Sequence, residues 1–390
     1  MIRLGVIGYG GRIHGMISSF RRISPDLRIV GVVDPDEKSA HARMADCDQD
    51  AVFYKDLAAM VKGAKLDALA IGTRCNLHSI YAVQAAAYDL PLFLEKPVAT
   101  SIRQATALEK AFANSRCEAV VSFPLRVSPL CELARQYIEE DAIGAPVHIA
   151  ATNYVPYGTT YWETPYRDYD VTGGLFLQKA THDLDYMSYL MGEPIVRVAA
   201  MATRGHVFGG KKKAKLYCSQ CDERATCLES PQNRARNSTT GRHTDHLCVF
   251  GRDCGKAEDG TLNEDCSSAL LEFASGAHGV YTQVFYARRD AGRRGAVISG
   301  YMGTVHFDWY ADELHRIRHH APFSAVEKAS GGASHFGGDV QLAYDFIDLI
   351  ENKTRPRTPI ETGIQSAYAC LAARESAQKG RYVDVRQVGG

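Results

Sequence analysis

The chain has 390 residues, of which 45% are hydrophobic and 23% are charged. This length and composition are typical of a soluble protein with two globular domains. The 45 basic and 45 acidic residues cancel, so neither a nucleic-acid partner nor a membrane surface is expected. No apolar run approaches the roughly 18–20 residues of a transmembrane helix.

The first residues do not have the features of a secretory signal. The segment from Ile2 to Ile7 runs directly into a glycine turn, without a cleavage site. We therefore expect a cytoplasmic protein. In that compartment the 11 cysteines are expected to be thiols or metal ligands rather than disulfides.

A strand at Ile2–Ile7, a glycine turn and a helix open the chain. The turn residues are Gly8, Gly10, Gly11, Arg12 and Ile13, with Ile13 at the position of the usual third glycine. Such a turn lets the backbone approach a pyrophosphate at the N-terminus of the helix. A second strand, Ile29–Val33, ends in Asp34, placed to bind the ribose hydroxyls of NAD and to repel the extra phosphate of NADP. The segment predicts an NAD site.

Strands and helices continue to alternate up to residue 123, which predicts a doubly wound parallel sheet. The further elements are strands at 66–71, 92–94 and 118–122, and helices at 82–87 and 102–113. Ligands bind outside the carboxyl ends of such strands. Polar residues directly after strands are therefore candidate cofactor contacts, namely Thr73, Asn76, His78, Glu95 and Lys96.

Two of these candidates keep an alternative interpretation. His78 is equally compatible with a structural histidine. Glu95–Lys96–Pro97 is compatible with an ordinary surface turn, since ion pairs in turns are common and weak. A lysine held partly out of water at this position can instead exchange protons near neutral pH.

The pattern changes after residue 124. A helix at 128–140 and a long strand at 147–155 lead into an aromatic loop, and the candidate substrate contacts are Arg126, Tyr154, Tyr157, Trp162 and Arg167. Aromatic faces with polar groups suit a carbohydrate, although aromatic residues also fill cores. On the following helix, Gln178 and His182 are one turn apart and share a face. A neutral imidazole can act there as a general base for a hydroxyl group.

The last third of the chain alternates in the manner of antiparallel strands. These segments are 270–273, 280–286, 296–299 and 304–308, followed by helices at 335–350 and 362–378.

Cysteines concentrate in a segment between about residues 205 and 266. The spacing favours a structural zinc ion, whose binding energy would fold a loop-rich insert. The predicted ligands are Cys218, Cys221, Cys227 and Cys248, with His246 as the main substitute. An iron–sulfur cluster and unligated thiols are the alternatives.

Taken in order, these motifs resemble the glucose–fructose oxidoreductase and myo-inositol dehydrogenase (Gfo/Idh/MocA) family, with a cysteine-rich insert. The resemblance rests on Gly8-x-Gly10, Asp34, Glu95–Lys96–Pro97, Gly173–Gly174 with His182–Asp183-x-Asp185, and Gly337–Gly338–Asp339. It implies a Rossmann domain at 1–123 and a C-terminal α/β domain at 124–390 with a large, open, mostly antiparallel sheet. That sheet often forms an oligomer interface, so a homo-oligomer is expected.

The resemblance also assigns roles to residues. It implies that Lys96 bridges the nicotinamide and the substrate, and that His182 acts on the substrate hydroxyl. Members of the family usually carry an aspartate four residues before this histidine, where this chain has Gln178 followed by Lys179. Gln178 can hydrogen-bond a hydroxyl group but cannot take a proton, and Lys179 is the candidate to replace that proton chemistry.

The leading functional hypothesis is an NAD-dependent oxidoreductase that acts on a hydroxyl group of a sugar or polyol. The first alternative is an NAD-dependent glycosidase that transiently oxidises the sugar, typically at C3, eliminates the aglycone and adds water. The second alternative is a non-catalytic protein that senses NAD or a sugar.

Overall fold

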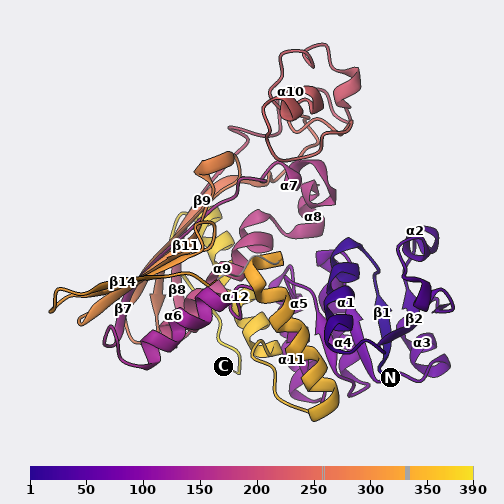
Figure 1. Cartoon of the computed structure of the whole chain (residues 1–390). Helices are drawn as coiled ribbons and strands as arrows, with labels where there is room; N and C mark the ends of the chain where they lie inside the picture. Colours follow the sequence, from indigo (N-terminus) through magenta and orange to yellow (C-terminus); the bar gives the residue numbers. More distant parts are fainter. Residues whose placement is uncertain (257, 259, 330–333, 390) are drawn as a thin grey trace. The chain divides into compact units, whose positions relative to one another are not determined.

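The computed structural model describes residues 1–256, 258, 260–329 and 334–389, and many of its helices and strands are labelled in Figure 1. Two compact units are present. Unit 1 comprises the described residues of Met1–Glu132, Gly331–Tyr368 and Arg386–Gly390, and unit 2 comprises those of Leu133–Ser330 and Ala369–Val385. Within the described ranges, no helix combines the length and the apolar character that crossing a bilayer requires.

Unit 1 is built on a parallel sheet with the strand order β3-β2-β1-β4-β5-β6. The strands are β1 (Arg3–Ile7), β2 (Arg28–Val33), β3 (Val52–Phe53), β4 (Ala68–Ile71), β5 (Leu92–Leu94) and β6 (Ala119–Val121). The chain winds outward in both directions from β1, so the order reverses between β1 and β4. In sheets of this kind, ligands bind beside the loops that follow these two strands.

Helices from both ends of the chain pack in unit 1. They are α1 (Gly11–Ile23), α2 (Glu37–His41), α3 (Leu57–Gly63), α4 (His78–Ala86), α5 (Ile102–Ala113) and α11 (Gly338–Asn352). Phe346 of α11 packs against Phe20 of α1 and Phe93 of β5, with ring centroids 4.9 and 5.6 Å apart. A segment more than 300 residues away in sequence therefore completes the core under the first helix.

Unit 2 contains a nine-stranded sheet with the order β14-β13-β12-β11-β7-β10-β9-β8-β15. The strands are β7 (Pro146–Tyr154), β8 (Ile195–Arg204), β9 (Glu264–Phe273), β10 (His278–Val284), β11 (Arg293–Gly300), β12 (Gly303–Asp308), β13 (Glu313–Arg318), β14 (Ser324–Glu327) and β15 (Val383–Asp384). Neighbours are antiparallel except β7 and β10, which pair in parallel.

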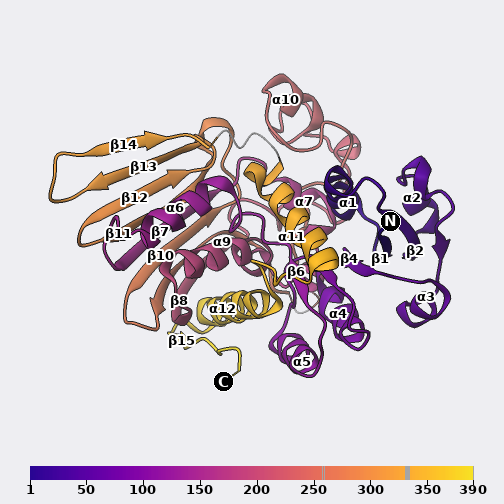
Figure 2. The same ribbon diagram turned by 60° about the horizontal axis from the view of Figure 1, so that its bottom comes forward.

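Helices cover one face of this sheet, as Figure 2 shows for α9 and α12. The remaining helices are α6 (Pro129–Glu139), α7 (Thr160–Glu163), α8 (Tyr169–Thr172), α9 (Leu175–Met191), α10 (Pro231–Arg236) and α12 (Ile360–Lys379). On the other face, small and apolar residues follow one another across adjacent strands. This row contains Ala199, Leu270, Val280, Ala150 and Val297.

The predicted fold class is confirmed, because a parallel sheet and a mostly antiparallel sheet are both present. The predicted α5 and β5 agree with the observed bounds. Strand β9 begins at Glu264 rather than at residue 270, and β8 was not predicted. The early part of β9 is missed because Cys266–Ser267–Ser268 lacks the β-branched and aromatic residues that mark strands.

The cysteine-rich insert connects β8 to β9. It consists of loops and α10, and it packs against the aromatic loop of unit 2 rather than standing alone. Trp162 and Phe208 are in ring contact at 4.8 Å, in a buried cluster that also includes Val249 and Phe285. The insert therefore shares an apolar core with the rest of unit 2.

Candidate active site

The glycine turn after β1 forms an open cradle at the N-terminus of α1. Gly8 has φ = +79°, and a Cβ there would lie 2.7 Å from the backbone of Thr73. A Cβ on Gly10 would come no closer than 4.0 Å to Gly72, and one on Gly11 would meet nothing within 4 Å. The space beside the first N–H groups of a 13-residue helix thus fits a pyrophosphate.

Ile13 and Asp34, the other two parts of the predicted NAD-binding motif, also have defined positions in the structure. Ile13 is fully buried, and a Cβ on Gly72 would lie 2.7 Å from its Cβ, so an apolar contact fills the place of the third glycine. Asp34 follows β2 and accepts hydrogen bonds from the backbone N–H groups of Tyr9 at 2.7 Å and Asp36 at 2.8 Å. Its carboxylate is therefore oriented by the glycine turn itself.

Arg12 extends its guanidinium group away from this turn into a polar network. It donates to Glu95 at 2.8 Å, to Asp339 at 2.8 and 2.9 Å, and to Ser122 at 2.9 Å. The side chains of Arg12 and Glu95, both predicted to contact the cofactor, are thus engaged with each other. The sequence could not show this arrangement, because Asp339 lies 327 residues away.

Residues that follow β4 and β5 surround the Lys96 turn. Asn76 Oδ1 is a buried acceptor for which the described residues supply no donor, so it is available to a cofactor amide or hydroxyl group. His78 is buried, and its ring nitrogens lie 2.8 Å from the carbonyl of Pro97 and 3.1 Å from that of Thr73. The His78 ring therefore supports the turn from inside unit 1, while Lys96 remains half-buried.

In unit 2, helix α9 carries Gln178 and His182 as buried neighbours on one face. Glu264 fixes the start of this helix. Its carboxylate accepts from the backbone N–H groups of Leu175 at 2.7 Å and Phe176 at 3.2 Å, and it pairs with Arg204 at 3.1 Å. A carboxylate at a helix N-terminus is favourable. Sequence reasoning missed this cap, since the two partners are 89 residues apart.

A second face of α9 carries Lys179 and Asp183. Lys179 Nζ donates to Tyr157 Oη at 2.7 Å. Asp183 accepts from Arg294 at 2.9 Å and from Tyr281 at 2.8 Å. Burial, together with the positive charge of Arg294, lowers the pKa of Lys179. Burial alone would raise the pKa of Tyr157, but the charges of Lys179 and Arg294 outweigh it and lower that pKa.

The structure separates several predicted substrate contacts. Asn153 reaches Asp183 of α9 at 2.8 Å, and successive strand residues point to opposite faces. Tyr154 therefore faces away from α9, where it lines a groove of about 420 Å³ on the open face of the sheet. Tyr154 thus points to the face of the sheet opposite to α9, the helix that carries His182, and its contact with a substrate stays a prediction.

Trp162 and Arg167 lie against the insert. Trp162 is 1% exposed and packs against Phe208, so it belongs to a core rather than to an open pocket. Arg167 is buried and pairs with Asp253 of the insert at 3.4 Å. Of the remaining candidates, Arg126 lies in unit 1, between β6 and α6.

The cysteines of the insert do not form the predicted zinc site. In the described part of the chain, no three His, Cys, Asp or Glu side chains gather closely enough to hold a metal ion. The predicted ligands are Cys218, Cys221, Cys227 and Cys248, and Cys218 Sγ lies 3.7 Å from Nε2 of the substitute ligand His246. Burial raises the pKa of Cys218 to about 12.

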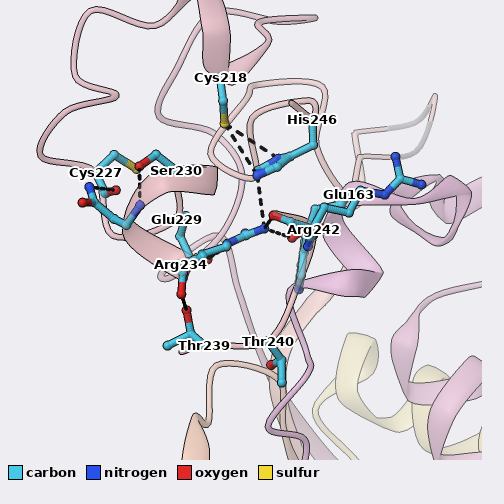
Figure 3. A network of polar contacts seen from close by, with 12 residues as sticks. Glu163, Cys218, Cys227, Glu229, Ser230, Arg234, Thr239, Thr240, Arg242 and His246 are labelled. Carbon is cyan, nitrogen blue, oxygen red and sulfur yellow. Dashed lines mark hydrogen bonds and ion pairs between the residues drawn. The ribbon is translucent and has the colours of Figure 1, made fainter. Parts of the chain in front are cut away.

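Figure 3 shows a buried arginine beside His246. Arg234 Nη1 lies 3.1 Å from His246 Nε2. Arg234 also pairs with Glu163 of α7 and with Glu229, and Glu163 accepts from the backbone N–H of Arg242 at 2.9 Å. The insert is therefore held to the aromatic loop by a buried ion network.

The parallel sheet, its open glycine cradle and Asp34 define a dinucleotide-binding protein with a Rossmann fold. Sequence comparison agrees: residues 2–123 match the oxidoreductase family with an NAD-binding Rossmann fold, and residues 131–306 match the GFO/IDH/MocA C-terminal domain. The chain belongs to the Gfo/Idh/MocA family of NAD-binding oxidoreductases.

Individual relatives are distant in sequence. The Bacillus subtilis oxidoreductase YteT is 23% identical over 365 residues, which are 84% of this chain and 83% of that protein. Inositol 2-dehydrogenase of Rhizobium meliloti is 27% identical over 52% of this chain and 58% of its own length. Levoglucosan dehydrogenase in complex with NADH and levoglucosan shares the fold, with a TM-score of 0.74 at 19% identity, covering 99% of this chain and all of that one.

Proposed function

We propose that the protein is an NAD-dependent dehydrogenase that oxidises a hydroxyl group of a sugar or polyol. The observation that carries the proposal is the open cradle at Gly10 and Gly11 beside Asp34 in a chain that retains Lys96 and His182. Relatives in the family are named for inositol and levoglucosan, which supports a polyol or sugar substrate.

Each residue has a definite part in this reaction. NAD, when bound, would supply the acceptor for the hydride of the carbinol carbon. Gly10 and Gly11 would hold its pyrophosphate, and Asp34 and Asn76 would offer hydrogen-bond acceptors to it. Lys96 donates a hydrogen bond to the substrate oxygen, and His182 receives the hydroxyl proton and passes it on. Gln178 orients the substrate, because its amide cannot take a proton.

Removal of the two proton-handling groups tests the assignment. Lys96→Ala and His182→Ala should each lower kcat by about 10²–10⁴-fold, while the dissociation constant for NAD changes little. Gln178→Ala should cost less. The assay is NADH formation with a panel of polyols and sugars. Near-native turnover in both alanine variants would reject the assignment, and aglycone release without net NADH would replace it with a redox-neutral glycosidase.

Cofactor preference gives an independent test. Asp34 lies where the 2′-phosphate of NADP would bind, so NAD should bind more tightly than NADP. Asp34→Ser should narrow that difference, because it removes the repelling charge. Isothermal titration with both cofactors measures the two dissociation constants, and equal or tighter NADP binding by the unmodified protein would contradict the assignment.

We also propose that the open face of the nine-stranded sheet forms a contact between two copies of the chain. The supporting observation is the row of small and apolar residues across five strands, in which Leu270 and Val297 are exposed. Leu270→Arg with Val297→Arg should yield a monomer by light scattering, with unchanged circular dichroism. A monomeric unmodified protein would reject this proposal.

A further inference from the structure

Arg12 is the centre of an ionic network that joins three segments of unit 1. Its Nε donates to Glu95 Oε1 at 2.8 Å, and its terminal nitrogens donate to both carboxylate oxygens of Asp339 at 2.8 and 2.9 Å. Both carboxylates are buried, with side-chain exposures of 7% for Glu95 and 6% for Asp339. A guanidinium that makes paired contacts of this kind fixes geometry as well as charge.

This network bears directly on the turn that carries Lys96. Glu95 is the preceding residue, and its backbone N–H donates to Ile71 of β4 at 3.0 Å. On the other side of Lys96, the carbonyl of Pro97 lies 2.8 Å from His78 Nδ1. Lys96 is therefore held by a backbone contact on each side, and Arg12 fixes the side chain next to it.

Arg12 holds the carboxylate of Glu95, the residue directly before Lys96. The charged or titratable groups on the surrounding elements are Arg12 of α1, Arg74, Cys75 and His78 before and in α4, Glu95 after β5, and His335 and Asp339 at the start of α11. Lys96 and Glu95 act with opposite signs on the pKa of Cys75, which burial raises to about 11. Both charges thus reach the same small region, in which Arg12 balances Glu95.

We propose that Arg12 is a positioning residue for Lys96, which acts by holding and neutralising Glu95 rather than by binding the cofactor through its guanidinium group. The inference rests on the proposed function only for the catalytic role of Lys96. Loss of Arg12 would leave a full negative charge beside Lys96 and stabilise its ammonium form. Loss of the Glu95 charge would remove that carboxylate, while Asp339 still pairs with Arg12, and would destabilise the ammonium form of Lys96.

The test follows the protonation of Lys96 in the protein without cofactor or substrate. Lysines are dimethylated with a carbon-13 label and titrated by NMR, and Lys96→Arg identifies the signal. Arg12→Gln should move the midpoint of Lys96 upward and Glu95→Gln should move it downward, each by about one pH unit. Arg12→Lys, which keeps the charge, should restore most of the midpoint.

Asp339→Asn is the matched control for a purely structural role. It removes the other partner of Arg12 and should lower thermal stability as Arg12→Gln does, yet it should leave the Lys96 midpoint within about 0.3 units, since Arg12 still faces Glu95. The dissociation constant for NAD should change less than threefold in Arg12→Gln.

Two results would overturn the inference. One is an unchanged Lys96 midpoint in Arg12→Gln, or shifts of the same sign in the two charge variants. The other is a loss of NAD affinity above tenfold in Arg12→Gln, which would assign the guanidinium to the cofactor. Because the titration needs no substrate, opposite shifts in a protein that oxidises no polyol would support this inference while rejecting the proposed function.

Discussion

Two buried ionic networks, one in each unit, carry opposite excess charge. In unit 1 the permanently charged Arg12 faces two carboxylates, Glu95 and Asp339, and His335 adds a positive charge beside Asp339 only when it is protonated. In unit 2 two cationic side chains, Lys179 and Arg294, surround one carboxylate, Asp183. The carboxylate oxygens of Asp183 accept hydrogen bonds from Arg294, Asn153 and Tyr281. Lys179 donates a hydrogen bond to the phenol oxygen of Tyr157.

The difference in charge has a direct chemical consequence. Burial alone would raise the pKa of Asp339, but hydrogen bonds and charge from His335 and Arg12 hold that pKa well below its usual range. In unit 2, burial lowers the pKa of Lys179, and the excess of positive charge lowers that of Tyr157. The acid-rich network therefore keeps Asp339 ionised. In the cation-rich network, Lys179 and Tyr157 each lose a proton at a lower pH than usual.

Removal of Asp183 should produce the largest effect, because it leaves two buried cations without a carboxylate. Asp183→Asn should destabilise unit 2 by about 3–5 kcal/mol. The measurement is the free energy of unfolding in urea. Glu272→Gln is the control, since it breaks an exposed pair with Arg197 and should cost at most about 1 kcal/mol. Equal losses in the two variants would show that the network of unit 2 contributes no more than a surface pair.

Loss of a carboxylate from the acid-rich network of unit 1 should lower the free energy of unfolding by less, and by an amount that depends on pH. Asp339→Asn leaves Arg12 paired with Glu95 and should cost about 2–3 kcal/mol at neutral pH. Because the pKa of Asp339 is depressed in the folded state, its contribution is present above the ordinary aspartate pKa of about 4 and is lost as the pH falls below it. Urea unfolding from pH 7 to pH 2 should show the variant and the unmodified protein converging. A constant gap over that range would rule out this linkage.

The same two networks show how far the sequence predicts the molecule. The alternation of strands and helices, together with the spacing of the glycines, predicted the parallel sheet, the cradle and the position of Lys96. These features depend on residues close together in the chain. Partners such as Asp339 for Arg12 and Glu264 for α9 are separated by 327 and 89 residues. No local sequence pattern marks such pairs. The sequence also does not distinguish an acidic residue that becomes buried from one that stays exposed.

The aromatic loop and the insert were harder still. The aromatic residues after β7 were assigned to substrate on composition, yet the fold buries Trp162 under Phe208 and turns Tyr154 to the open face of the sheet. The cysteine spacing predicts zinc, but it gives no sign of the buried ion network of Arg234, Glu163 and Glu229 that contacts His246. A spacing motif records possible ligands, but it does not record the charges that three-dimensional packing adds.

The smallest expected effect is the most direct measure of the cation-rich network. One of the 20 tyrosines should ionise below the ordinary phenol pKa of about 10, and this signal should be absent in Tyr157→Phe. Lys179→Met should move it upward, because the methionine keeps the apolar stem but removes the charge. The ultraviolet absorbance of tyrosinate, recorded during a pH titration without ligands, gives the midpoint.

Tyr161→Phe is the matched control for that titration. Tyr161 also lies within 5.5 Å of Lys179 Nζ, but burial raises its pKa well above the usual value, so its removal should leave the early signal intact. A depressed pKa means that ionised Tyr157 adds stability above about pH 10, which is lost as the pH falls through the lowered folded-state pKa. Tyr157→Phe should therefore lose more stability at alkaline pH than at pH 6, where its cost is that of the lost hydrogen bond to Lys179. If a tyrosine of Tyr157→Phe still ionised below the ordinary phenol pKa of about 10, the lowered pKa would belong to another tyrosine. The proposed difference between the two networks would then be rejected.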